Sequence, residues 1–521
     1  MTLTNCLRGR PPPSLMLHTI QQAINPHDRY QIEFKLDYEL LDDNRTNYRV
    51  YTYFFLPQSL GISEDSYSKS DFYRDVQNYI RLKTPNLDLG AFAEQFDSPL
   101  TAVHRIVKTD GWRYDDALKH QLVNNLKLLS AMLKTSVREH FQLIYQRIEE
   151  APADAKVHRI IHNLVEAFLA GTEAITTSYR SLFAEFNLPG VDDEIFIAYK
   201  LTDEYTSLLI EEAAIEMYQI VDANLKNVKQ EQFKKQLSVR SAKESKHRRA
   251  MGYESVLKEG DDNEMYVFRA SVLKKYAASV LYLSTAIHRE GRGTEQILYA
   301  VAAGISMLFA TGLAFYFQSV YGNLTVPFFA ALVVGYMFKD RIKDFARHIF
   351  SEKLQDRLYD RRVDIRSLDG KHKLGVLREK ISFVQEKDVP RPVLQARNKH
   401  VFADLAYAGY GEVIMCHTKD VVLYADAFEK VSVDIPTMTG LNDITRYDVR
   451  QFLKKMAAPI QERPYLVHGK LTSITAHKVY HLNLISRYRV LEPKAEKEKA
   501  HNRVRVVLNQ KGIKRIEQVP V

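Results

Sequence analysis

The sequence predicts an α+β membrane protein. In chain order it predicts an N-terminal β-hairpin with a helical bundle, a two-helix transmembrane hairpin, a charged helical stalk and a C-terminal mostly-β domain. Three observations predict this class. The 43 residues from Gln296 to Phe338 contain no Asp, Glu, Lys, Arg or His. Alternating apolar residues occur near both ends of the chain, and apolar stripes of helical period lie between them.

The length of the chain and its many charged residues predict sizeable soluble domains on both sides of the apolar run. The chain has 521 residues, 73 basic and 64 acidic, with a net charge of +9. Its two cysteines, Cys6 and Cys416, cannot form a disulfide framework, which suits a reducing compartment. The N-terminal tail, residues 1–26, has no apolar core of signal-peptide length.

Residues 27–225 are predicted to form a cytoplasmic β-hairpin and helical-bundle domain. Residues 32–38 alternate between apolar and charged side chains, residues 41–47 are polar, and residues 48–55 are rich in aromatic residues. Three apolar stripes follow, and they predict helices over 122–148, 156–186 and 192–226. Long helices with short connections favour an antiparallel bundle.

Residues 226–296 are predicted to be a basic linker and a helix, from about 263 to 288, that leads to the membrane. Residues 226–258 carry most of the net positive charge. They are interpreted as a solvated helix face or a loose linker, with attraction to an anionic membrane surface as the alternative. Nucleic acid is an unlikely partner, because Phe233 is the one aromatic residue within the basic run. Gly291 and Gly293 mark a possible hinge, or a simple kink.

The apolar run is predicted to span the membrane twice, as 297–317 and 321–338, within a hairpin of residues 297–338. A buried hairpin in a large soluble core is the alternative. Positive charge gathers on the cytoplasmic side of membrane proteins. Both termini are therefore expected in the cytoplasm, at a bacterial inner membrane. The residues that orient the hairpin are Arg289, Arg292, Lys339, Arg341, Lys343 and Arg347.

Small residues recur at four-residue spacing on both predicted spans, and this spacing allows close helix packing in lipid. The packing is expected within the hairpin, with contact between subunits as the alternative. The residues are Ser306, Ala310, Ala314, Ala331 and Gly335.

Beyond the membrane, residues 339–369 are predicted to form a helical stalk, because acids follow bases at three-residue spacing. Residues 370–521 are predicted to form a cytoplasmic mostly-β domain. Its expected strands include 413–416 and 421–424, joined by a turn at 417–420, followed by 479–490 and 504–508.

Two groups of histidines are weighed as sites. His158, His162 and Glu166 recur every four residues, so they share one helix face and are weak candidates for a metal site. An exposed polar face is the favoured interpretation, because no fourth ligand is identifiable. His468, His477 and His481 could support acid–base or metal chemistry in the β domain, although ordinary strand residues are favoured. No cofactor is expected, and an enzyme is improbable.

The order of cytoplasmic domain, first span, Tyr321-Gly322-Asn323, short second span and basic exit resembles the CorA-type magnesium channels. That family carries Tyr-Gly-Met-Asn at the end of its first span. The methionine is missing here, and the long C-terminal region has no counterpart in that family, so the resemblance covers about 50 residues and is not adopted.

The sequence thus predicts a membrane-anchored cytoplasmic sensor or scaffold that acts through protein contacts. Its expected partners are the lipid bilayer and proteins of unknown identity, and a homo-oligomer is possible. The alternative is an oligomeric pore or ion-channel-like effector gated by the cytoplasmic domains. A third hypothesis is an enzyme that uses the late histidines.

Overall fold

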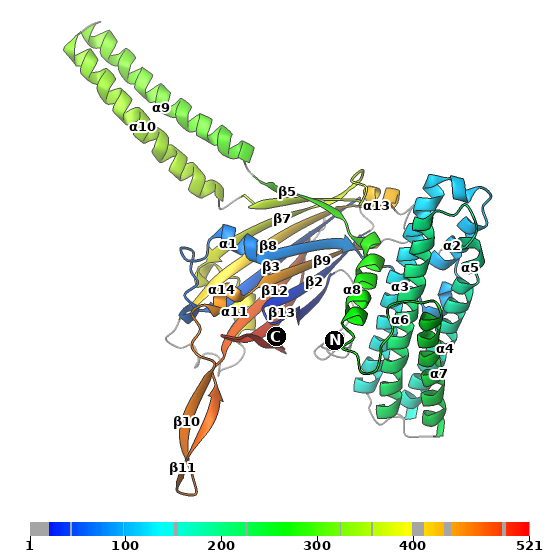
Figure 1. Cartoon of the computed structure of the whole chain (residues 1–521). Helices are drawn as coiled ribbons and strands as arrows, with labels where there is room; N and C mark the ends of the chain where they lie inside the picture. Colours follow the sequence, from blue (N-terminus) through cyan, green and yellow to red (C-terminus); the bar gives the residue numbers. More distant parts are fainter. Residues whose placement is uncertain are drawn as a thin grey trace.

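The structure is a computed structural model that describes residues 20–41, 44–96, 98–150, 155–224, 228–290, 292–322, 325–355, 358–398, 411–431, 439–491 and 496–519. Residues 1–19 of the expected N-terminal tail lie outside these residues, as do Gly291 and Asn323, and residues 20–26 of that tail form a strand. Figure 1 shows a β structure with a helical bundle on one side and a long helical arm projecting from its edge.

Two sheets and a hairpin make up the β structure. The four-stranded sheet has the order β1 (Ile20–Pro26), β2 (Gln31–Glu39), β9 (Gly440–Asp448) and β4 (Val76–Leu82). The eight-stranded sheet has the order β14 (Gly512–Val519), β13 (Glu496–Asn509), β12 (Tyr480–Leu491), β3 (Arg45–Pro57), β8 (Glu412–Tyr424), β7 (Lys373–Val384), β6 (Arg361–Arg366) and β5 (Ser284–Arg289). A separate hairpin, β10 (Ile460–Val467) and β11 (Lys470–His477), projects away from both sheets (Figure 1).

The two ends of the chain build these sheets together. Strand β3 lies between β12 and β8, so that Tyr53 pairs with Ile485 on one side and Cys416 on the other. Strand β2 pairs with β1 and β9, not with β3. The expected N-terminal β-hairpin and the expected separate C-terminal β domain are therefore wrong. One sandwich replaces them, with buried residues of both sheets in one core, such as Phe34, Phe54 and Leu484.

The helical bundle packs beside the sandwich. Its helices are α2 (Pro99–Val107), α3 (Asp116–Glu150), α4 (Ala155–Arg180), α5 (Phe183–Phe186), α6 (Asp193–Asn224), α7 (Val228–Ala250) and α8 (Glu264–Ala278). A shared core joins the bundle to the sheets through residues such as Tyr38, Ile80 and Leu126. Ser98 begins α2 by accepting a hydrogen bond from the Thr101 amide, with Pro99 in the first turn.

Shorter helices complete the fold. The α-helices are α1 (Lys69–Asp75), α11 (Arg391–Asn398), α13 (Ala425–Val431) and α14 (Arg450–Leu453). The 3₁₀ turns are Gln58–Leu60, Leu89–Phe92, Trp112–Tyr114, Ser279–Leu281 and Glu386–Asp388. Helix α11 covers the second face of the large sheet, where Val393 packs with Phe55 and Ile485.

The arm consists of α9 (Arg292–Tyr321) and α10 (Val326–Gln355), which run antiparallel (Figure 1). The prediction of two membrane spans is wrong. Within the described residues one helical segment, Gln296–Tyr321, is long and apolar enough to cross a membrane. Helix α10 begins at Val326 and meets its first charge at Lys339, so its apolar part is 13 residues (326–338), about 20 Å long. A crossing needs roughly 20 residues.

The segments that flank the arm also differ from expectation. Helix α10 is described as far as Gln355 and residues 361–366 form β6, so the predicted stalk over 339–369 is wrong in its last part. The predicted helix over 263–288 ends at Ala278, and β5 follows it. Both differences arise because β5 and β6 pair with each other along the edge of the large sheet, with Arg289 opposite Arg361.

Candidate functional site: a projecting apolar arm

The arm leaves and rejoins the sandwich at one place. Strand β5 leads into α9 and strand β6 follows α10, and these two strands are antiparallel neighbours. Consequently the sandwich and the bundle lie at the same end of the arm, while its tip, where α9 ends at Tyr321 and α10 begins at Val326, points away from them (Figure 1).

The outer surface of the arm is apolar over its distal half. Large side chains there are exposed over much of their surface, which soluble proteins rarely allow over a contiguous area. The most exposed are Met307 (63%), Leu308 (75%), Phe315 (66%), Tyr316 (63%), Val326 (82%), Phe329 (68%), Tyr336 (65%) and Met337 (65%). This surface can be covered by lipid or by another apolar surface.

The small residues lie between the two helices. Ser306 is fully buried, Ala331 is 6% exposed, and Ala310 and Ala314 are half-buried. A methyl group added to Gly335 would come within 3.4 Å of the Leu313 side chain and 3.7 Å of the Ala310 carbonyl oxygen. The small-residue face is therefore used for packing within the arm.

The basic residues are spread along the proximal half of the arm. The Lys339 ammonium lies 5.2 Å from the ring centre of Tyr336, and the Arg347 guanidinium lies 5.4 Å from that of Tyr299 on α9. Arg341 is exposed and Lys343 is half-buried, with Asp340 and Asp344 among them. Arg289 ends β5, and Arg292 and Gly293 lie in the first turn of α9, so this glycine is not a break between helices.

Within the described residues, the histidines of the two groups are not gathered around a common centre. His162 Nδ1 lies 3.5 Å from the exposed Glu166 carboxylate, its ring packs edge-on against Phe233, and the His158 side chain lies outside the described residues. Within the described part of the chain, no three His, Cys, Asp or Glu residues are placed to hold a metal ion. The late histidines are dispersed: His468 occupies the turn of the β10–β11 hairpin and His477 its opposite end. His481 lies half-buried on β12.

The basic segment that sequence reasoning placed in a linker or a solvated helix face is helix α7, and several of its charges are buried. Arg240 is 4%, Glu244 0% and Arg248 1% exposed. Glu244 accepts hydrogen bonds from Arg180 of α4 at 2.6 Å and lies 2.9 Å from Arg240. Asp203 of α6 accepts from Arg180 and lies 2.6 Å from His247. Two arginines of α7, Arg240 and Arg248, are thus neutralised inside the bundle, whereas Lys235, Lys243, Lys246 and Arg249 lie on an exposed face of the helix.

A second buried cluster of charges lies between the two sheets and was missed by sequence reasoning. Residues 417–420 are not a turn; they continue strand β8, so His417 and Lys419 face inward. Lys419 donates to Asp443 at 2.7 Å and lies 3.6 Å from Glu379. Residues 413–416 and 421–423 are continuous apolar runs on either side of the polar residues 417–420, so no period-two pattern in the sequence identifies one long strand.

The electrostatics of this cluster follow from its burial. Burial alone would raise the pKa of Glu379, but nearby His417 and Lys419 and a 2.6 Å hydrogen bond from Asn78 lower it to about 2. Burial lowers the pKa of His417, whose Nδ1 lies 2.8 Å from the Tyr447 hydroxyl. The side chains of Glu379, His417, Lys419 and Asp443 are each at most 3% exposed, so no substrate reaches them. Their bonds join strands of the two sheets.

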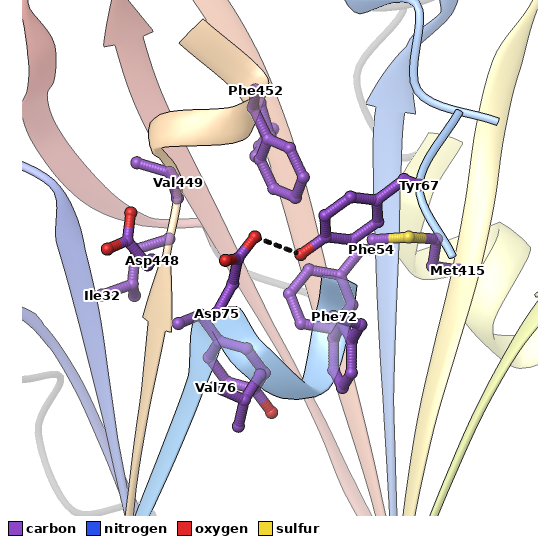
Figure 2. A pocket seen from close by; sticks show the side chains of 12 residues that line it. Ile32, Phe54, Tyr67, Phe72, Asp75, Val76, Met415, Asp448, Val449 and Phe452 are labelled. Atoms are coloured by element: carbon purple, nitrogen blue, oxygen red, sulfur yellow. Dashed lines mark hydrogen bonds between the residues drawn. The ribbon is translucent and has the colours of Figure 1, made fainter. Parts of the chain in front are cut away.

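The cavity in Figure 2 lies in the sandwich core, close to α1 and α14. Its volume of about 10 Å³ holds at most one water molecule. Its wall is largely apolar, and the Tyr67 hydroxyl donates to Asp75 at 3.0 Å (Figure 2). Burial raises the pKa of Asp75, and this closed space offers no room for a ligand.

Comparison with known proteins gives no relative: no family model, no curated protein and no solved structure matches this chain. The arm is therefore the feature of the described structure that points most directly to a function.

Proposed function

We propose that this protein is attached to a lipid bilayer by its arm, which inserts tip-first while the sandwich and the bundle remain together on one side. The observation that carries the proposal is the exposed apolar surface on the distal half of α9 and α10, at the end farthest from the sheets. Lipid tails satisfy such a surface, and helices keep their backbone groups bonded in lipid.

The depth of insertion follows from the charges. The apolar part of α10 is about 20 Å long, which is less than the roughly 30 Å thickness of the hydrocarbon core. We therefore propose that the tip ends within the bilayer. Lys339, Arg341 and Lys343 then lie at the level of the headgroups, where their cationic ends meet anionic lipid.

The side of the membrane follows from the same residues. Positive charge favours the cytoplasmic face, and the chain enters and leaves the arm at adjacent strands. Both termini are proposed to lie in the cytoplasm, at the inner membrane of a bacterium. With the membrane holding its arm, the body is proposed to act as a sensor or scaffold through contacts with proteins. A homo-oligomer remains part of this proposal.

A matched pair of substitutions on α10 tests the attachment. Phe329 is 68% exposed near the tip, and Phe345 is 67% exposed two residues after Lys343. Phe329→Asp is expected to reduce flotation with phosphatidylglycerol-containing vesicles strongly, since a carboxylate in hydrocarbon costs about 3 kcal/mol. Phe345→Asp is expected to leave flotation nearly unchanged. Equal flotation of both variants and the unaltered chain would reject insertion of the tip.

A further inference from the structure

A pocket lies where the base of the β10–β11 hairpin meets two turns of the sandwich. Its volume is about 290 Å³, and small-molecule sites begin at about 300 Å³. Three segments that are far apart in the chain line it: the turn between β1 and β2, the base of the hairpin, and the turn that leads from β13 into β14. Several of the lining residues are exposed, so a small molecule can enter from solvent.

The pocket is lined by basic and not by acidic side chains among the residues that the structure describes. The four basic residues are Arg29, His477, Lys511 and Lys514, and they come from all three segments. Within the described part of the chain, no ion pair joins any of the four to a carboxylate. Positive charges that gather in a concave place raise the local concentration of anions.

The acids of the same segments lie outside the pocket lining. The Oδ1 atom of Asp28 accepts hydrogen bonds from two backbone amides of its own turn, at 2.6 and 2.8 Å. Glu517 of β14 accepts a hydrogen bond from Arg515 at 2.6 Å. Glu462 of β10 is exposed on the hairpin. The positive charge of the pocket is therefore available to a group from outside the chain.

Backbone contacts hold Arg29 against the turn between β13 and β14. The Ile513 amide donates a hydrogen bond to the Arg29 carbonyl oxygen at 2.7 Å. Gly512 has a φ of 124°, and a Cβ atom there would lie 2.4 Å from the same carbonyl oxygen, so glycine is needed for this approach. The Arg29 guanidinium lies 5.8 Å from the ring centre of Tyr30, and its N–H groups make no ion pair among the described residues. Arg29 is thus placed next to the two pocket lysines with donors to offer.

The base of the hairpin supplies the remaining wall. Ile460 lies directly opposite His477 in the register of β10 and β11, so both side chains face the same side of the hairpin. The Lys478 amide donates to the Pro459 carbonyl oxygen at 3.0 Å, which closes the hairpin at this end. Pro459, Ile460 and Ile513 add apolar surface to the lining. The pocket therefore combines cations with apolar side chains.

We propose that this pocket binds a small soluble compound that carries a phosphate group on an apolar part. A guanidinium matches the geometry of phosphate oxygens, ammonium groups add point charges, and the apolar residues cover the rest of the ligand. The hairpin and the arm project on opposite sides of the sandwich (Figure 1), so a bilayer that holds the arm does not reach the pocket. The choice of a soluble compound over a lipid headgroup rests on the proposed attachment of the arm, whereas binding of the phosphate group does not.

Titration calorimetry of the purified full chain in detergent, with phenyl phosphate as the ligand, tests the pocket. The unaltered protein is expected to bind it saturably, and to bind inorganic phosphate more weakly because that ion has no apolar part. Arg29→Gln and Lys514→Gln are each expected to weaken binding about tenfold, a loss typical of one charge-assisted hydrogen bond. Both positions are exposed, so folding is expected to be retained. The matched control is Lys470→Gln, an exposed lysine at the other end of the same hairpin, which is expected to leave binding unchanged.

Two results would overturn the site: no saturable binding of phenyl phosphate, or equal loss in Lys470→Gln and in the pocket variants. Thermal unfolding of each variant separates lost binding from lost folding. Equal affinity for inorganic phosphate would contradict the apolar part of the ligand. Tighter binding of a short-chain, soluble phosphatidic acid than of phenyl phosphate would assign a lipid headgroup in place of a soluble compound. The titration uses no bilayer, so its failure is distinct from a failure of the arm to carry the protein to vesicles.

Discussion

The arm and the body of this protein, which is the sandwich together with the bundle, place polar and apolar residues in opposite ways. The arm exposes large apolar side chains, with Leu308 75% and Phe329 68% exposed, and carries no charge over its distal half. The body instead buries charges, and Glu244, Arg248, Glu379 and Lys419 are each at most 3% exposed. The comparison teaches that the surroundings of a residue, not its polarity alone, decide where it is stable.

The two arrangements have different requirements. A buried charge is stable only when partners satisfy it, and in the bundle Arg180 bonds both Asp203 and Glu244. An exposed apolar helix needs no polar partner, but it needs a medium other than water. The buried charges of the body are thus satisfied within the chain, whereas the exposed apolar side chains of the arm are not covered by any described residue.

The largest expected effect comes from removing one partner of a buried charge. Glu244→Ala leaves Arg180 and Arg240 without a carboxylate that both contact, at 2.6 and 2.9 Å. Arg180 keeps its bond to Asp203 and Arg240 its bond to Glu173, so we expect a loss of about 3 kcal/mol in the free energy of unfolding, the worth of two charge-assisted hydrogen bonds. Denaturant unfolding of the purified chain, followed by circular dichroism, measures this loss.

The control for this variant lies on the same helix. Glu231 is an exposed acid of α7 whose side chain is 77% exposed, and it lies 3.3 Å from Lys234. Glu231→Ala is expected to change the free energy of unfolding by less than about 0.5 kcal/mol, because exposed pairs contribute little. A similar loss in both variants would remove the distinction between buried and exposed charges on which the comparison rests.

The next largest loss of stability is expected when the pH is lowered, because this protonates the buried cluster of charges between the sheets. The pKa of Glu379 is about 2 in the folded protein and about 4.5 in the unfolded chain, so its stabilisation is present above pH 4.5 and is lost as the pH falls toward 2. The loss is up to about 3 kcal/mol. Folding also lowers the pKa of His417, so below about pH 6.5 the unfolded chain takes up a proton before the folded protein does. Falling pH therefore lowers the free energy of unfolding through His417 as well.

Thermal unfolding between pH 7 and pH 2.5 measures this dependence, and Glu379→Gln is the informative variant. The variant lacks the carboxylate, so its melting temperature is expected to fall less steeply than that of the unaltered protein below pH 4.5. Parallel curves for the two proteins would mean that Glu379 does not stabilise the sandwich through its charge.

The same comparison explains how much of the structure the sequence could predict. The charge-free run marks the arm directly, because absence of charge over 43 residues is a local signal. The sandwich could not be found this way, because Tyr53 pairs with Ile485 and Glu33 with Arg446, more than 400 residues apart. Local periodicity identifies a strand but not its partner.

The buried charges were missed for a related reason. His417, Thr418, Lys419 and Asp420 were interpreted as a turn because they are polar, and α7 was interpreted as a solvated segment because it is basic. The groups that compensate them, such as Glu379, Asp443 and Arg180, lie on other elements. The second span was overestimated because residues 321–325 were counted as helix, although α10 begins at Val326.

The smallest effect is expected inside the arm, at Gly335 of α10, where the two helices approach closely. A Cβ atom there would already touch Leu313 at 3.4 Å, so the larger side chain of Gly335→Leu must push α9 and α10 apart. We expect a loss of about 1–3 kcal/mol, the usual cost of overpacking, less the gain in helix propensity of about 1 kcal/mol. Thermal unfolding in detergent, followed by far-ultraviolet circular dichroism, measures this loss.

Gly312 on α9 supplies the matched control, because a Cβ atom there would meet no other atom within 4 Å. Gly312→Leu adds the same side chain to the exposed surface of the same arm, so only the helix propensity and the apolar surface increase. It is expected to leave the arm's unfolding temperature unchanged or raised, and to strengthen flotation with vesicles. If Gly312→Leu instead destabilised the arm as much as Gly335→Leu, that surface of α9 would be in contact with protein and not with lipid. The apolar exterior of the arm would then be covered by another protein chain, and the arm would bury its apolar residues as the body does.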